Sequence, residues 1–195
     1  MEIDYRVIIW SLAILLTLRW YYYYLRDIFQ WKTKPHIFSW FIWWILTWIG
    51  FIIQFNDNAW PGAWITLVSA IFCLFITVLA LKYWEKNITT SDTLSFIGAI
   101  IATIIWLWLD NPLLSLIIII IIDTLSFYPT FRKSWYKPWE ETLIHYSFAS
   151  LKFLLAIIAL NNFSLLTVLY PLSLVVANGA FVIMVLVRKK ALNIK

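Results

Sequence analysis

The chain has 195 residues, of which 63% are hydrophobic and only 13% are charged, and its mean hydropathy is +0.84. A soluble domain carries roughly 45–50% apolar and about 25% charged residues. One core of this size cannot hide the excess apolar surface, so the composition argues against a soluble domain and predicts an integral membrane protein. The net charge of +5 does not indicate nucleic-acid binding, because the basic residues gather in short segments between apolar runs.

The sequence predicts neither an enzyme nor a bound cofactor or metal. Cys73 is the single cysteine and lies in an apolar run, and the two histidines, His36 and His145, are far apart. There is no Gly-rich phosphate loop, no His-Glu metal spacing and no serine nucleophile in a recognisable context. The first residues, Met1 to Arg6, do not have the basic character of a signal peptide, so we expect the first apolar run to be a retained helix.

Seven apolar runs approach the length of roughly 20 residues that crosses a bilayer as a helix. The segments between them contain charges, Pro or Asn, as turns require. The continuous Ile and Leu runs do not alternate with polar residues as strands would. The sequence therefore predicts an all-α membrane protein with seven transmembrane helices, at about 5–25, 37–55, 62–84, 93–109, 112–130, 141–160 and 164–188.

The distribution of basic residues predicts the orientation of these helices. Most of the 15 Lys and Arg residues follow the first, third, fifth and seventh runs. Loops on the cytoplasmic side of a membrane carry an excess of Lys and Arg. We therefore expect the N-terminus outside and the C-terminus inside.

A faint internal repeat divides the chain. Lys34-Pro35 after the first run recurs as Lys137-Pro138 after the fifth, and in each half two further helices follow. We expect 3+1+3 parallel repeats, with a first triple-helix bundle at 1–90, a linker helix at 91–111 and a second triple-helix bundle at 112–195. Such repeats are typical of transporters, whose substrates bind near the membrane midplane where the halves meet.

Two segments carry a resemblance to a known family. The segment 126–134, with Pro129-Thr130 followed by Lys133-Ser134, resembles the PQ-loop pattern, although Thr130 stands in place of Gln. The segment 24–40 looks like a diverged copy. Proteins of this superfamily include SWEET sugar transporters, bacterial vitamin transporters of the nicotinamide-riboside type and the ER retention-signal receptor. The resemblance implies a three-one-three bundle with a small-molecule site between its halves.

The chain is also similar to small bacterial membrane proteins with a Thr-Lys-Pro loop before Ser-Trp. This similarity implies a location in the bacterial inner (plasma) membrane.

Asp123 and Lys152 are the first candidates for a substrate site. Asp123 follows a run of isoleucines near the centre of the fifth run, and Lys152 lies at similar depth in the sixth. Ionisable groups inside a membrane span are costly, face the bundle interior and pair with one another. Ser126 shares the face of Asp123, and His145 shares the face of Lys152 and could pass a proton. The alternative is that Asp123 and Lys152 form a permanent ion pair that joins two helices.

Three further residues complete the predicted site. Arg19 lies at the depth of Asp123, so together with Lys152 it predicts a substrate with a carboxylate or phosphate. Alternatively, Arg19 extends to the cytoplasmic interface beside the tyrosine run 21–24. Trp44 and Asn178 are candidate wall residues, suited to stacking and amide hydrogen bonds.

The sequence as a whole predicts a membrane transporter that moves a small polar or anionic solute by alternating access. Coupling to protons through Asp123 is a further hypothesis. The expected partners are a small-molecule solute and the lipid bilayer, not nucleic acid, and the chain is expected to act as a monomer or homo-oligomer. The main alternative is a non-transporting seven-helix membrane receptor or sorting protein that releases its ligand with pH through His145. A channel is a third, weaker alternative, because the interior polar groups are few and of opposite charge.

Overall fold

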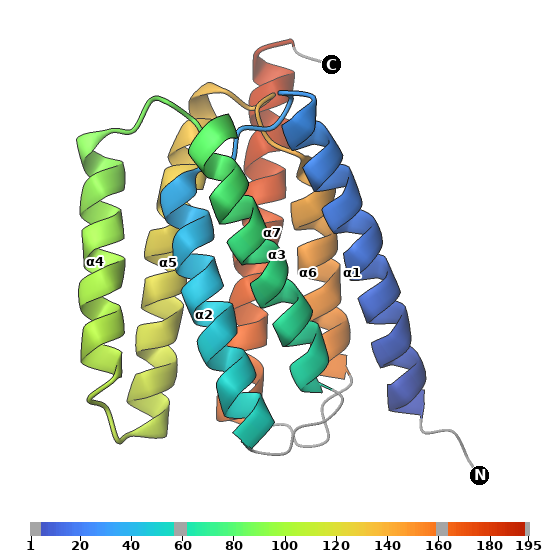
Figure 1. The fold of residues 1–195 in the computed structure, drawn as a ribbon, viewed down its shortest axis with the longest axis vertical. Coiled ribbons are helices and arrows are strands. Elements are labelled where there is room, and N and C mark those ends of the chain that lie inside the picture. Colours follow the sequence, from blue (N-terminus) through green and yellow to red (C-terminus); the bar gives the residue numbers. More distant parts are fainter. Residues whose placement is uncertain (1–4, 57–61, 159–163, 194–195) are drawn as a thin grey trace.

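The computed structural model describes residues 5–56, 62–158 and 164–193, which form seven helices and no strand. Consecutive helices run in opposite directions (Figure 1). The helices are α1 (Tyr5–Phe29), α2 (Ile37–Asn56), α3 (Gly62–Tyr83), α4 (Thr90–Trp106), α5 (Pro112–Tyr136), α6 (Leu143–Ile158) and α7 (Leu165–Ala191). The all-helical prediction is therefore confirmed, while the predicted turns at Asp57-Asn58 and Asn161-Asn162 lie outside the described residues.

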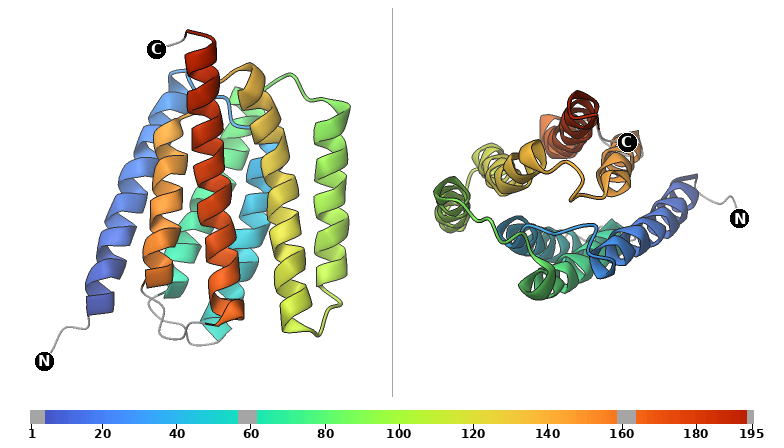
Figure 2. Two further views of the ribbon diagram at one scale, coloured as in Figure 1. Left: turned by 180° about the vertical axis from the view of Figure 1, so that it is seen from behind. Right: turned by 90° about the horizontal axis from the view of Figure 1, so that it is seen from above.

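The helices form two layers, with α4 at one edge (Figure 2). In one layer α3 lies between α1 and α2, and in the other α7 lies between α5 and α6. The layers meet where α2 packs on α5 and α1 packs on α6, and α4 contacts α5 and α2. The order of neighbours is thus the same in the first three helices as in the last three.

The fifth helix is longer than the sequence predicts. We expected it to end near residue 130, but α5 continues through Pro129 to Tyr136. Proline in a helix interior removes one backbone hydrogen bond and usually kinks the helix. Here the turn after Pro129 is held by tertiary contacts, because Arg132 bonds Asp92 and Lys133 pairs with Glu141. Local sequence rules for helix ends do not include such contacts.

Two helical segments, Leu113–Tyr136 and Val168–Ala191, are long and apolar enough to cross a membrane, and only 33% and 22% of their most apolar stretches are buried. Shorter apolar helices are Ile37–Ile49, Leu67–Tyr83, Thr90–Trp106 and Leu143–Leu155. Large apolar side chains are exposed along several helices; examples are Leu81, Leu94, Val176 and Ile183. Exposed apolar surface on this scale is typical of proteins that contact lipid.

Aromatic side chains fill the core between the two layers. A buried cluster contains Tyr24, Trp40, Tyr146 and Phe181, so it takes side chains from both layers. A second cluster around Ile42 joins α2 to α4 and α5. Rigid aromatic packing of this kind fixes the distance between the layers.

Candidate functional site

His145 lies inside a ring of aromatic side chains between the layers. Its imidazole centroid is 4.7 Å from that of Tyr24, 5.3 Å from those of Tyr21 and Tyr146, and 5.6 Å from that of Trp40. No side-chain hydrogen bond of His145 to another described residue is formed. Aromatic faces are electron-rich, so this environment suits a cationic or planar group better than an anion.

Asp123 is a buried carboxylate that has no cationic partner among the residues that the structure describes. Its side chain belongs to α5, and the residue is 5% exposed. Trp43 is the side chain that approaches this carboxylate, although its indole Nε1 forms no hydrogen bond of normal geometry to any described group. Burying a charged carboxylate without a partner is costly, so such a group binds a proton or a cation when one is accessible.

Lys152 is a half-buried residue of α6. Its ammonium lies 4.7 Å from the centroid of the Phe153 ring, and its charge acts on His145 and on Cys73 of α3. The backbones of α6 and α3 are not in contact.

The alternative interpretation of Asp123 and Lys152, a permanent ion pair that joins two helices, is wrong, because no such pair is formed in the described part of the chain. The reason is the position of α7, which lies between α5 and α6 and keeps these consecutive helices apart. Both charges consequently remain without an ion-pair partner among the described residues.

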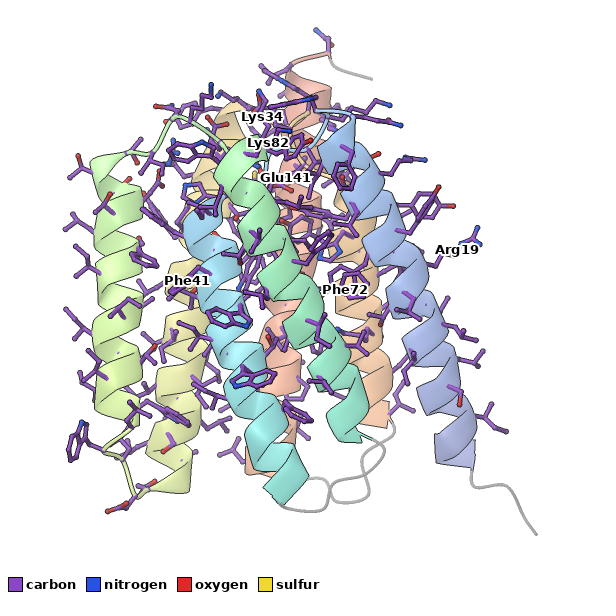
Figure 3. All side chains as sticks on the ribbon, in the orientation of Figure 1. Arg19, Lys34, Phe41, Phe72, Lys82 and Glu141 are labelled. Atoms are coloured by element: carbon purple, nitrogen blue, oxygen red, sulfur yellow. The ribbon has the colours of Figure 1, made fainter. Side chains whose placement is uncertain are left out.

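Arg19 is exposed and points away from the bundle (Figure 3). Its guanidinium donates to the Tyr23 hydroxyl at 3.3 Å and lies 5.7 Å from the centre of that ring. Arg19 therefore does not join Lys152 in an interior anion site, and the alternative of an interfacial arginine fits the geometry.

The three remaining predicted residues lie at separate places in the core. Ser126 is buried and donates to the carbonyl of Ile122 at 2.7 Å, and Asn178 is buried and donates from Nδ2 to the carbonyl of Leu174 at 2.8 Å. Trp44 is partly buried with its ring 5.7 Å from that of Phe41. Hydroxyl and amide groups that bond their own helix avoid the cost of unsatisfied burial. This bond uses the Asn178 Nδ2 donor and not the amide oxygen, which can accept a further hydrogen bond.

A buried ionic network at the basic end of the bundle is the part of the site that sequence reasoning missed. Lys133 is 2% exposed and forms an ion pair with Glu141. Its ammonium also donates to the carbonyl of Lys34 at 2.6 Å and to that of Glu140 at 3.3 Å. All three donors of this lysine are therefore used.

Glu141 links this lysine to the aromatic core. The hydroxyls of Tyr24 and Tyr146 donate to its Oε2 at 3.2 Å and 3.3 Å. Burial raises the pKa of Glu141 above the ordinary value, although Lys133 and both tyrosines act in the opposite direction. Because Tyr24 belongs to α1 and Glu141 precedes α6, this carboxylate joins the two layers.

A second group lies where the loop before α2 meets α4 and α5. Arg132 Nε donates to Asp92 Oδ1 at 2.6 Å, and His36 Nε2 is 3.5 Å from Asp92 Oδ2. Burial lowers the pKa of His36 to about 4; the charges of Lys133 and Arg132 add to this effect, and Asp92 opposes it. His36 is therefore neutral at pH 7.

A third group crosses between the two Lys-Pro loops. Lys137 donates to both Glu85 carboxylate oxygens at 2.9 Å and 3.1 Å, and Lys34 pairs with Glu140 (Figure 3 shows Lys34 at this end). Burial alone raises the pKa of Glu85, but hydrogen bonds from Lys137 and from the Asn87 amide, together with the charge of Lys137, lower it to about 2. This end of the molecule is thus closed by paired charges.

Hydrogen bonds at the junction of the layers occur in related pairs. Thr130 of α5 donates to Ser39 of α2 at 2.9 Å, and Thr142, just before α6, donates to Asp27 of α1 at 3.0 Å. A shift of 103 positions relates these partners (27 to 130, 39 to 142), and the same shift relates the two Lys-Pro pairs (34 to 137, 35 to 138). Equivalent positions of the two halves therefore make equivalent contacts.

The charged residues of this network are visible in the sequence, but local rules assign them other roles. Glu140 and Glu141 indicate favourable charge at a helix N-terminus, and Lys133 counts among the basic residues that predict orientation. In the structure α6 begins only at Leu143, and both glutamates pair with lysines instead. The recurrence of Lys34-Pro35 as Lys137-Pro138 is the feature of the sequence that indicates a relation between these two loops.

A groove lies among α4, α5 and α7. It has a volume of about 740 Å³ and is lined mostly by apolar side chains of α5 and α7, with Ser95 from α4. None of the seven residues predicted for the substrate site lines it.

Comparisons with protein-family models, with curated proteins and with solved structures give no match.

Proposed function

We propose that this chain is a seven-span membrane transporter of the PQ-loop type, with its N-terminus outside, that moves a small polar solute by alternating access. The observation that supports it most directly is the pair of three-helix layers with the same order of neighbours, joined by the equivalent bonds Thr130–Ser39 and Thr142–Asp27. Two similar halves that meet face to face can rock against each other around a site between them.

The proposed solute site lies between the layers, with Asp123 and Lys152 as its charged groups. Neither side chain has an ion-pair partner among the described residues, so both are available to a solute with polar groups of either sign. His145, Trp44 and Asn178 are proposed as further walls. Arg19 is outside this site, so Lys152 is the interior cation that remains to hold a carboxylate or phosphate.

The ionic network of Lys133, Glu141, Lys34 and Glu140 is proposed as the closed end of the transport path. Opening this end requires the contacts between the layers to separate. Buried ion pairs exchange between discrete arrangements rather than deforming gradually, as alternating access requires.

A flux assay tests the transport proposal. Purified protein in proteoliposomes is given radiolabelled nicotinamide riboside, glucose and succinate in separate assays, with and without a proton gradient. We expect saturable uptake of at least one of these solutes, lost in Lys152→Ala and preserved in the exposed control Arg19→Ala. Uptake that is driven by protons and unchanged in Asp123→Asn would remove the proposed coupling, and no uptake of any solute would argue against the transporter.

A receptor or sorting protein is the second candidate function. The observation in its favour is the group of aromatic side chains that surrounds His145. These side chains could hold a ligand and release it when the imidazole gains a proton. Solute that stabilises the purified protein at pH 7.5 without crossing the membrane would favour this candidate.

A further inference from the structure

A hollow of about 320 Å³ lies at the basic end of the molecule, away from the predicted substrate residues. Its walls are Trp31, Lys34, Trp84, Glu85, Lys86 and Lys137. Three lysines line this hollow against Glu85 and against Glu140, which pairs with Lys34 and Lys137 behind it, so the group keeps one net positive charge. It holds the equivalent of about ten water molecules, enough for a phosphate group with a glycerol- or sugar-sized substituent.

The lysines of this hollow are largely positioned before any ligand arrives. Lys137 is held by Glu85 at 2.9 Å and 3.1 Å, and Lys34 is held by Glu140. Each ammonium carries three donors, so these pairs leave donors available. Lys86 is exposed and forms no ion pair in the part of the chain that the structure describes. Prepositioned donors lower the ordering cost of binding.

Trp31 occupies an unusual backbone conformation at the rim of the hollow. Its φ is 58°, in the left-handed region that a residue with a Cβ adopts at a cost. The residue ends α1: its amide donates to the Ile28 carbonyl, and the Lys32 amide donates to the Asp27 carbonyl. Glycine is usual at this position of a helix end. Here the indole instead packs 4.6 Å from the Tyr83 ring, centroid to centroid, and forms a wall of the hollow.

We infer that this hollow is a binding site for a phosphate monoester or diester, with Lys34, Lys86 and Lys137 on the phosphate oxygens and the two tryptophans against its substituent. A phosphate presents more charged oxygens than a carboxylate, which matches three ammonium groups around one space. The source is either a soluble phosphate ester or a phospholipid headgroup, since basic pockets on the cytoplasmic side of membrane proteins hold anionic headgroups and tryptophans lie at headgroup level.

Binding here would tie together three loops. Trp31 and Lys34 follow α1, Trp84 to Lys86 follow α3, and Lys137 follows α5. A phosphate in the hollow therefore bridges the two halves of the chain and stabilises the closed basic end.

Thermal unfolding of the full chain in a neutral detergent tests the soluble source. The probe is glycerol 3-phosphate, compared with sodium chloride at equal ionic strength. We expect the probe to raise the Tm of the wild type, with half-saturation at an about five-fold higher concentration in Lys86→Gln. Lys32→Gln, which removes an exposed lysine outside the hollow, is the matched control. Trp31→Gly suits the left-handed backbone, so weaker binding in this variant reports the lost wall rather than misfolding.

Native mass spectrometry tests the lipid source. The protein is reconstituted in nanodiscs of phosphatidylcholine and phosphatidylglycerol, and retained lipids are compared among the wild type, Lys86→Gln and Lys32→Gln. A Tm shift without selective lipid retention supports a soluble ester, and selective retention of phosphatidylglycerol that falls in Lys86→Gln supports a headgroup. If Lys86→Gln and Lys32→Gln behave alike in both experiments, the inferred site is wrong.

Discussion

At the scale of single residues, burial decides what each charge does. The ion pair between Lys133 and Glu141 leaves 1% and 0% of the two side chains exposed. Removing one partner of such a pair leaves the other buried without compensation, which costs far more than losing an exposed ion pair. Lys133 is therefore a structural residue, although its position in a basic segment is typical of a solvated lysine.

Lys133→Met is expected to destabilise the protein by about 3–5 kcal/mol, because the Glu141 carboxylate stays buried without its cation. The double variant Lys133→Met/Glu141→Gln is expected to recover most of this loss, since the amide is neutral and still accepts from Tyr24. Chemical unfolding in mild detergent measures both values, with Lys32→Met as an exposed control. A single variant as stable as the wild type would contradict the buried pair.

Stability is expected to fall between pH 6.5 and pH 4 through His36. Its pKa in the folded protein is about 4, so the unfolded chain gains a proton in this range while the folded protein stays neutral. The loss amounts to about 3 kcal/mol, is absent above pH 7 and is complete below pH 4. His36→Asn is expected to show a flatter profile between these values.

The effect of His36 can be distinguished from acid unfolding through carboxylates, because Glu85 acts in a lower pH range. Its folded pKa of about 2 lies below the ordinary value, so its contribution is present above about pH 4.5 and is lost only as pH falls toward 2. Because the raised pKa of Glu141 acts in the opposite direction, the test is the difference between two profiles: a His36→Asn profile parallel to that of the wild type from pH 7 to 4 would contradict the role of His36.

At the scale of elements, helix ends combine local sequence signals with distant contacts. Asn111 begins α5 as expected from local rules: its side chain accepts from the amides of Leu113 and Leu114 at 3.0 Å and 3.1 Å, with Pro112 in the first turn. The other end of α5 does not follow such rules, because Lys133 is anchored by a residue outside the helix.

Asn111→Ala is expected to destabilise the protein by about 1 kcal/mol through loss of this cap. Asp110→Ala, one position earlier and exposed, is the matched control and is expected to change stability by less than about 0.5 kcal/mol. Thermal or chemical unfolding in the same detergent measures both. Equal effects of the two variants would show that the cap makes no separate contribution.

At the scale of the whole molecule, the layered arrangement and the basic end define a topology that can be tested. Single cysteines at Lys32 and Lys190 are expected to resist a membrane-impermeant maleimide in intact cells, while Asp110→Cys is labelled. The reason is that Lys32 follows α1 and Lys190 belongs to the last turn of α7, whereas Asp110 lies in the connection from α4 to α5, and Figure 1 shows these segments at opposite ends of the bundle. Cys73 is buried and provides a low background.

Permeabilised cells provide the control for this experiment, since all three cysteines are then expected to react. Labelling of Lys32→Cys and Asp110→Cys from the same side of the membrane would contradict both the orientation and the seven-span proposal. Labelling from opposite sides would support them without bearing on transport.

The number of helices and most of their boundaries followed from the sequence, because an apolar run of about 20 residues between turn residues has few alternatives to a helix. The Lys34-Pro35 and Lys137-Pro138 recurrence also indicated the relation between the halves. These features are local, or are repeated in a local pattern, so the sequence by itself determined them.

The tertiary structure decided which charges meet. The sequence places Asp123 and Lys152 at similar depth in consecutive helices, but α7 lies between α5 and α6 and separates them. Likewise, only the folded chain brings Glu141 to Lys133 and directs Arg19 away from the bundle. Which side chains meet across the layers depends on the order of the packed helices and on the rotation of each helix about its axis. The hydropathy of the sequence determines neither, because lipid and protein core are both apolar.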